Sequence, residues 1–169
     1  MREFLANEKS YILERAAYLI EIAPVDAAVK KEGKWSCKEI IGHLIDSASN
    51  NHQRFIRAQF TDDLIFPPYQ QDEWVRAENY QNEDWNILID LWRSYNLHII
   101  HAVDNIPAGI LTKIRAKHNP DIKQWKYIPA SYKPAHDNFA VTLEYLIMDY
   151  FGHIHHHMKQ LESVIKAIR

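Results

Sequence analysis

The chain has 169 residues, of which 47% are hydrophobic and 25% charged, a composition typical of one globular domain with an apolar core. Its formal charge of −2, with 20 Lys and Arg against 22 Asp and Glu and no long basic run, argues against nucleic-acid binding. No segment reaches the roughly 18 consecutive apolar residues of a membrane span, and the N-terminal residues do not resemble a secretion signal. We therefore expect residues 1–169 to form a single domain of a soluble, cytoplasmic protein.

The first half of the chain predicts two long helices. Apolar spacing favours a helix over about 7–22, which Pro24 would end, and a second helix that continues to about Phe60. The second helix begins with a capping box, in which Ser36 is the N-cap and Glu39 follows three residues later. The proline-rich, aromatic segment 61–74 is predicted to be a loop.

The second half predicts two more helices, over about 83–105 and 137–168. Between them, the connection from Pro107 to His136 is too long for a simple turn. It contains GILTKIRA and WKYIPASY, which could pair as a hairpin or include a short helix. Four amphipathic helices without an alternating strand pattern indicate an all-α protein: a four-helix bundle with a long connection between the third and fourth helices.

The last helix carries four histidines close together in the sequence. His153 and His157 are an i,i+4 pair, roughly 40° apart, on the apolar stripe that faces the bundle interior. His155 points roughly 160° away from His157 and is expected to face water, while His156 lies on the flank. Two inward imidazoles cost desolvation unless they are partnered. A metal ion would partner both, and hydrogen bonds within the core are the alternative.

The second helix offers a polar strip. His43 lies at the edge of its apolar stripe, and Ser47, Asn50 and Arg54 follow along the same edge. This strip is either the wall of a wet cleft or a solvated flank.

The remaining histidines and the single cysteine point to no other chemistry. His52 is expected to be packed or exposed, and His98 and His101 to lie at the surface or rim of the third helix. Cys37 alone can form neither an intrachain disulfide nor a cysteine-based zinc cluster. The sequence also lacks the H-E-x-x-H, Glu-x-x-His, G-x-S-x-G and glycine-rich phosphate-loop motifs.

Three segments, KWSCKEIIGHLIDSASNNHQRFIRA, PPYQQDEWV and TLEYLIMDYFGHIHHHMKQLESVI, resemble the DinB/YfiT-like superfamily over nearly the whole chain. In that family, W-S-x-x-E-x-x-x-H and H-x-x-x-H segments supply three histidine ligands to one divalent metal ion, nickel or zinc. The matching positions are His43, His153 and His157. The resemblance also implies a homodimer. One departure is the sequence after Tyr69, which has glutamine where relatives often have the first acidic residue of Y-D-x-D.

Three imidazole ligands leave open positions on a metal ion, as in catalytic sites. The resemblance therefore implies a metal-dependent hydrolase that acts on a small substrate through a metal-activated water. One alternative is an S-transferase that uses a low-molecular-weight thiol such as bacillithiol or mycothiol, and another is a non-enzymatic metal-binding or stress-response dimer.

Four further residues are predicted to support the metal or bind substrate. Asp149, one turn before His153, fits a carboxylate behind a metal ligand. Asp72 is predicted to line the mouth of the site from the loop. Asn50 and Arg54 are predicted to contact the substrate, Arg54 through a carboxylate of the thiol if one is used.

Overall fold

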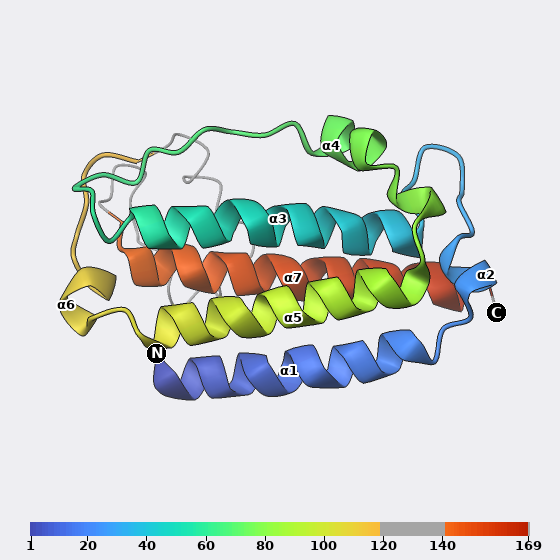
Figure 1. The fold of residues 1–169 in the computed structure, drawn as a ribbon, viewed down its shortest axis with the longest axis horizontal. Helices are drawn as coiled ribbons and strands as arrows, with labels where there is room; N and C mark the ends of the chain where they lie inside the picture. Colours follow the sequence, from blue (N-terminus) through green and yellow to red (C-terminus); the bar gives the residue numbers. More distant parts are fainter. Residues whose placement is uncertain (119–140, 169) are drawn as a thin grey trace.

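The computed structural model describes residues 1–118 and 141–168 of the chain, and its long elements are all helices (Figure 1). The four long helices are α1 (Arg2–Ile20), α3 (Cys37–Arg57), α5 (Trp85–Asp104) and α7 (Leu143–Lys166). The connections, as far as the structure describes them, contain three short α-helices and one 3-10 helix: α2 (Pro24–Ala27), α4 (Gln71–Glu78), η1 (Tyr80–Asn82) and α6 (Ala108–Leu111). The predicted all-α four-helix bundle is confirmed.

The long helices are not arranged in a simple up-and-down order. Helix α5 packs against both α1 and α3, and α3 also packs against α7. Helices α3 and α5 run in the same direction, and the segment between them returns along the length of the bundle beside α3 (Figure 1). A hydrogen-bonding contact between Glu8 and His155 and an ion pair between Arg15 and Glu162 join α1 to α7 and close the bundle.

Aromatic side chains fill much of the interior. Trp85, Trp92, Phe55 and Phe151 are among the largest fully buried side chains. The core also contains a satisfied polar group, because Asn96 donates to the Trp92 carbonyl at 2.8 Å and accepts from the Tyr150 hydroxyl at 2.5 Å. None of the described helices combines the length and apolar character needed to cross a membrane.

Several predicted boundaries of the first two helices were wrong by a few residues. Helix α1 begins at Arg2 rather than near Asn7, since Leu5 is already in the core and its amide bonds to the Met1 carbonyl. Helix α3 ends at Arg57 rather than near Phe60. Its capping box of Ser36 and Glu39 is confirmed.

The segment predicted as a loop over 61–74 is partly helical, because α4 begins at Gln71. Asn79 ends this helix in the left-handed conformation, with φ of 54°. Asp72 therefore belongs to the first turn of a helix instead of a loop.

The last long helix and the connection before it are described in part. Helix α7 begins at Leu143, with the Thr142 hydroxyl accepting from the Tyr145 amide as N-cap, rather than near Asp137. Val141 instead pairs with Arg115 through two backbone hydrogen bonds. The connection does include a short helix, α6, whereas the WKYIPASY segment lies outside the described residues.

A close approach between α3 and η1 depends on Gly42. A Cβ built at this position would lie 2.1 Å from Cδ2 of the Tyr80 ring. The Tyr80 ring is buried, and its hydroxyl donates to Asp46 Oδ1 at 2.7 Å, so it cannot move aside without losing that bond.

Gly42→Ala is expected to lower the free energy of unfolding by about 1–3 kcal/mol through this overlap. Gly109→Ala is the matched control, because a Cβ there meets nothing within 4 Å. In an exposed helix this substitution should change stability by no more than about 1 kcal/mol, and in the favourable direction. Urea unfolding of both variants is the measurement, and equal effects would contradict the packing argument.

Candidate metal centre

Three histidines from two helices meet inside the bundle. His43 lies in the second turn of α3, and His153 and His157 lie one turn apart on α7. Each histidine offers one ring nitrogen, and these three nitrogen atoms all lie within 4.8 Å of one another. The Nε2 atoms of His43 and His153 are 3.2 Å apart. Antiparallel packing of α3 on α7 thus brings together the three residues that the resemblance implied.

Neighbouring groups hold the rings in place. His157 Nδ1 is 2.8 Å from the amide oxygen of Gln160, which can only accept, so Nδ1 carries the proton and the Nε2 lone pair is free. Ser47 Oγ lies 3.5 Å from His153 Nδ1. The Trp35 ring packs on His43 with centroids 4.9 Å apart and closes one side of the cluster.

The cluster is strongly desolvated. His43 is 1% exposed and His157 is 9% exposed. Burial, followed by the proximity of His157, lowers the pKa of His43 to about 3. Burial likewise lowers the pKa of His153, with further contributions from the other histidines. It also lowers the pKa of His157, against the opposing effect of the hydrogen bond to Gln160. All three rings are therefore neutral near pH 7, the form that binds metal.

The cluster fits a divalent metal ion. Two imidazole nitrogens on one tetrahedral zinc ion would be separated by about 3.3 Å, given bonds of about 2.0–2.1 Å. The observed separation between His43 and His153 Nε2 is 3.2 Å. A cation between these lone pairs would also compensate for their burial. Among the described residues, this is the group of at least three His, Cys, Asp or Glu side chains close enough to hold an ion.

Asn50 and Arg54 lie farther along α3 than the cluster. Asn50 donates to the Asp46 carbonyl at 2.9 Å, and the Arg54 guanidinium lies over the Phe66 ring. Together with Gln53, Arg57 and Pro67 they line a small pocket of about 130 Å³. Their predicted contact with a substrate stays a prediction.

The roles predicted for Asp72 and Asp149 also stay predictions. Asp72 is exposed on α4. Asp149 is half-buried, and its charge raises the pKa of Tyr145, secondarily to burial.

A buried carboxyl group that was not predicted from the sequence lies on α3 close to His43 in the chain. Asp46, three residues after His43, is 3% exposed and accepts from Tyr80 at Oδ1. Its Oδ2 is buried and has no hydrogen-bond partner among the described residues. Burial raises the pKa of Asp46 to about 6, although the Tyr80 hydrogen bond opposes the shift. The feature of the sequence that could have indicated this buried carboxyl group is an acidic residue beside the apolar residues of the segment HLIDSA.

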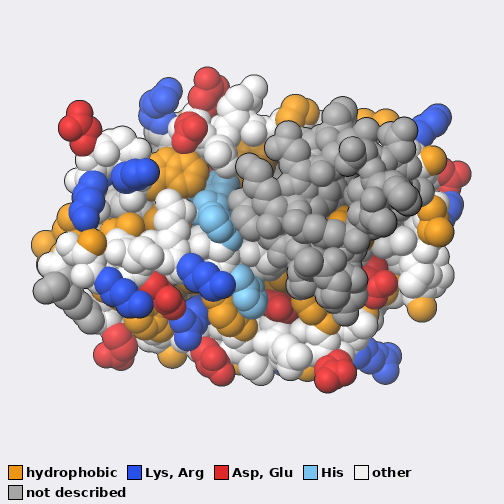
Figure 2. Space-filling view, turned by 180° about the vertical axis from the view of Figure 1, so that it is seen from behind, with side chains coloured by type: hydrophobic (Ala, Val, Ile, Leu, Met, Phe, Trp, Pro, Cys, Tyr) orange, Lys and Arg blue, Asp and Glu red, His pale blue; other side chains and the backbone are white. Residues whose placement is uncertain are grey.

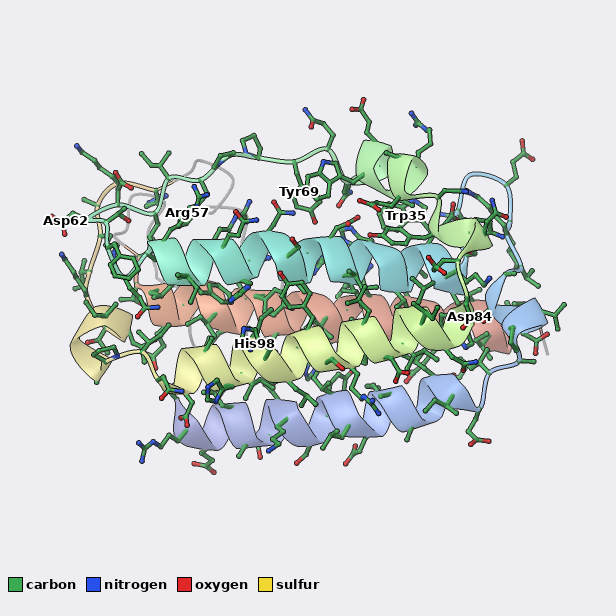
Figure 3. The ribbon with its side chains drawn as sticks, in the orientation of Figure 1. Trp35, Arg57, Asp62, Tyr69, Asp84 and His98 are labelled. Atoms are coloured by element: carbon green, nitrogen blue, oxygen red, sulfur yellow. The ribbon has the colours of Figure 1, made fainter. Side chains whose placement is uncertain are left out.

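Tyr69 connects this carboxyl group with the histidines. Burial raises its pKa to about 12, and the charge of Asp46 adds to the shift, while a hydrogen bond with Ser47 lowers it. Tyr69 and Trp35 lie between α3 and the chain segment that passes over it (Figure 3). The polar strip of α3 is thus the wall of a covered site rather than a fully solvated flank.

His155 keeps 37% of its side chain exposed to water, and it also contacts helix α1, which was not predicted. Its Nε2 lies 2.8 Å from Glu8 Oε2, and its ring stacks on Tyr11 with centroids 3.9 Å apart. Helix α1 covers this side of α7, which the spacing within α7 alone could not reveal. His156, by contrast, is exposed. Histidine side chains reach the surface near the middle of the face shown in Figure 2, beside an apolar patch.

No family profile matches the sequence, and no curated protein matches it significantly. YfiT from Bacillus subtilis aligns with a TM-score of 0.72 over 99% of this chain and 89% of that chain. The chain has the fold of YfiT. That protein is described as a probable metal-dependent hydrolase with an unusual four-helix bundle topology. At 16% sequence identity the similarity establishes the fold alone.

The first prediction for the site concerns metal content. Untagged protein purified without added metal or chelator should contain one divalent ion per chain by mass spectrometry. The His153→Ala/His157→Ala variant should lose it, because a single imidazole cannot hold the ion. His156→Ala should retain it, since this neighbouring side chain is exposed. Gln160→Ala should weaken binding about 10-fold by releasing the His157 ring. Equal metal content in all variants would contradict the site.

A second prediction concerns the buried carboxyl group. The folded-state pKa of Asp46 is raised from 3.8 to about 6, so the folded protein retains a proton that the unfolded chain releases. This contribution to stability is present below pH 4 and is lost as the pH rises to 6. The free energy of unfolding of Asp46→Asn, measured relative to wild type, should therefore increase by roughly 1 kcal/mol between pH 5 and pH 7. Urea unfolding at matched pH values measures this difference, in which the shared histidine contributions cancel. A difference independent of pH would contradict it.

Proposed function

We propose that the protein is a metal-dependent hydrolase in which one divalent ion, nickel or zinc, is held by His43, His153 and His157. The observation that carries this proposal is the convergence of three neutral imidazoles on one point. Such an ion has positions left for water and substrate, and it lowers the pKa of bound water toward neutrality. The fold shared with YfiT, itself described as a probable metal-dependent hydrolase, adds support.

The residues around the histidines have distinct roles in this proposal. Gln160 and Ser47 orient the imidazoles from behind, and Trp35 excludes water from one side. Asp46 is the candidate proton acceptor, because a carboxyl group with a pKa of about 6 exchanges protons readily near neutral pH. Tyr69 and Ser47 lie between it and His153.

Thiol S-transfer is the second candidate, and one observation favours it. The pocket at Asn50 and Arg54 lies on the same edge of α3 as His43, and Arg57 adds a second guanidinium. Two guanidinium groups and an amide are suited to a carboxylate. A low-molecular-weight thiol with a carboxylate, such as bacillithiol, could bind there with its sulfur toward the histidines. A homodimer, which rests on the resemblance, remains part of the proposal, together with a small-molecule substrate and a cytoplasmic location, which rests on the sequence composition.

The functional prediction is tested with metal-loaded full-length protein on a panel of activated esters and anilides without added thiol. We expect turnover that falls at least about 100-fold in His43→Ala, because the ion that activates water is lost. The control variant His156→Ala should retain this turnover. Asp46→Asn should retain the metal but lose rate.

The alternatives give different results in the same assay. Turnover that requires a low-molecular-weight thiol and still depends on His43 would replace hydrolysis by S-transfer. No turnover with or without thiol, in protein shown to hold its ion, would favour the non-enzymatic metal-binding dimer.

A further inference from the structure

A second group of histidines lies away from the proposed metal centre. His52 of α3 packs edge-on against His98 of α5, with ring centroids 5.0 Å apart and planes at 81°. His101, three residues after His98 on α5, has its ring centroid 6.5 Å from that of His98. His98 is labelled on α5 in Figure 3. Three imidazoles from two packed helices therefore form one cluster.

This cluster is separate from the first. His52 follows His43 by nine residues, which places it about 13 Å along the helix and roughly 180° around it. It faces α5, whereas His43 faces α7. One ion cannot bind both histidines.

The spacing of His52 and His98 matches that of the first cluster. There the ring centroids are 4.5 Å to 5.1 Å apart, with planes at 67° to 75°. Two imidazoles bound through nitrogen to one tetrahedral ion have ring centroids about 5 Å apart. The 5.0 Å separation therefore allows a shared ion, although packed aromatic rings in the core, such as Tyr150 and Phe151 at 5.1 Å, have the same spacing.

The exposure of the second cluster allows an ion to enter from solvent. His98 and His101 are exposed and His52 is half-buried, in contrast to the nearly inaccessible His43. The exposed His101 side chain can rotate, and its position one turn from His98 puts it on the same side of α5. Burial, and then the neighbouring His98, lower the pKa of His52, which favours the neutral imidazole that a metal needs.

We propose that His52 and His98 bind a second divalent transition-metal ion, with His101 completing the site as a third ligand once its side chain has rotated, because in the structure these three histidines do not meet as those of the first cluster do. Imidazole nitrogens suit zinc, nickel and copper, while magnesium and calcium prefer oxygen ligands. The remaining positions would be taken by water, so the ion should exchange faster and bind more weakly than at the buried cluster. This proposal does not depend on the hydrolase function.

The test is calorimetric titration of the full-length protein with zinc, beside metal analysis after equilibrium dialysis. Wild type should bind two ions per chain with different affinities. His98→Ala, a substitution at an exposed position, should weaken the second binding event at least about 10-fold and leave the first unchanged. His52→Ala should do the same. His118→Ala serves as the control for loss of a histidine outside both clusters.

The converse variant separates the two sites. His153→Ala/His157→Ala should lose the tight ion and retain the weaker one. Nitrogen couplings in the electron paramagnetic resonance spectrum of added Cu²⁺ should then disappear with His52 and His98. The proposal is overturned if wild type binds only one ion at millimolar zinc, or if the weaker binding persists in His52→Ala/His98→Ala. In either case, the contact between the two rings is aromatic packing alone.

Discussion

Mutual burial of three imidazoles is the constraint on which the rest of this structure depends. The rings of His43, His153 and His157 can meet only if the beginning of α3 lies opposite the middle of α7, which the antiparallel packing of these helices provides. Burial leaves the rings neutral near pH 7. A bound cation would replace the interactions with water that the imidazoles lose when they are buried. Ion binding is therefore coupled to the stability of the bundle.

The unusual helix order also serves the site. Because α3 and α5 run in the same direction, the chain between them must return along the whole bundle, and it does so over α3 (Figure 1). This return brings Tyr69 and Tyr80 against the polar edge of α3, where they contact Ser47 and Asp46. Gly42 lets the Tyr80 ring approach the helix. The connection is thus one wall of the site as well as a link between helices.

Helix α3 carries histidines on two opposite sides. His43 faces α7 in a nearly inaccessible position, and His52 faces α5 close to solvent. Because α3 packs against both neighbours, each histidine finds partners on a different helix. The buried cluster suits an ion that stays bound, while the exposed cluster suits an ion that exchanges with solvent.

The sequence by itself determined the features that depend on local order. Helical periodicity predicted the four long helices and the shared face of His153 and His157, and the capping box located the start of α3. The family resemblance added His43. Only the tertiary structure decided the features that need a distant partner: the burial of Asp46 against Tyr80, the pairing of His155 with Glu8 and the meeting of His52 with His98. Periodicity specifies which side of a helix is apolar, whereas the identity of what covers each side depends on packing between segments far apart in the chain.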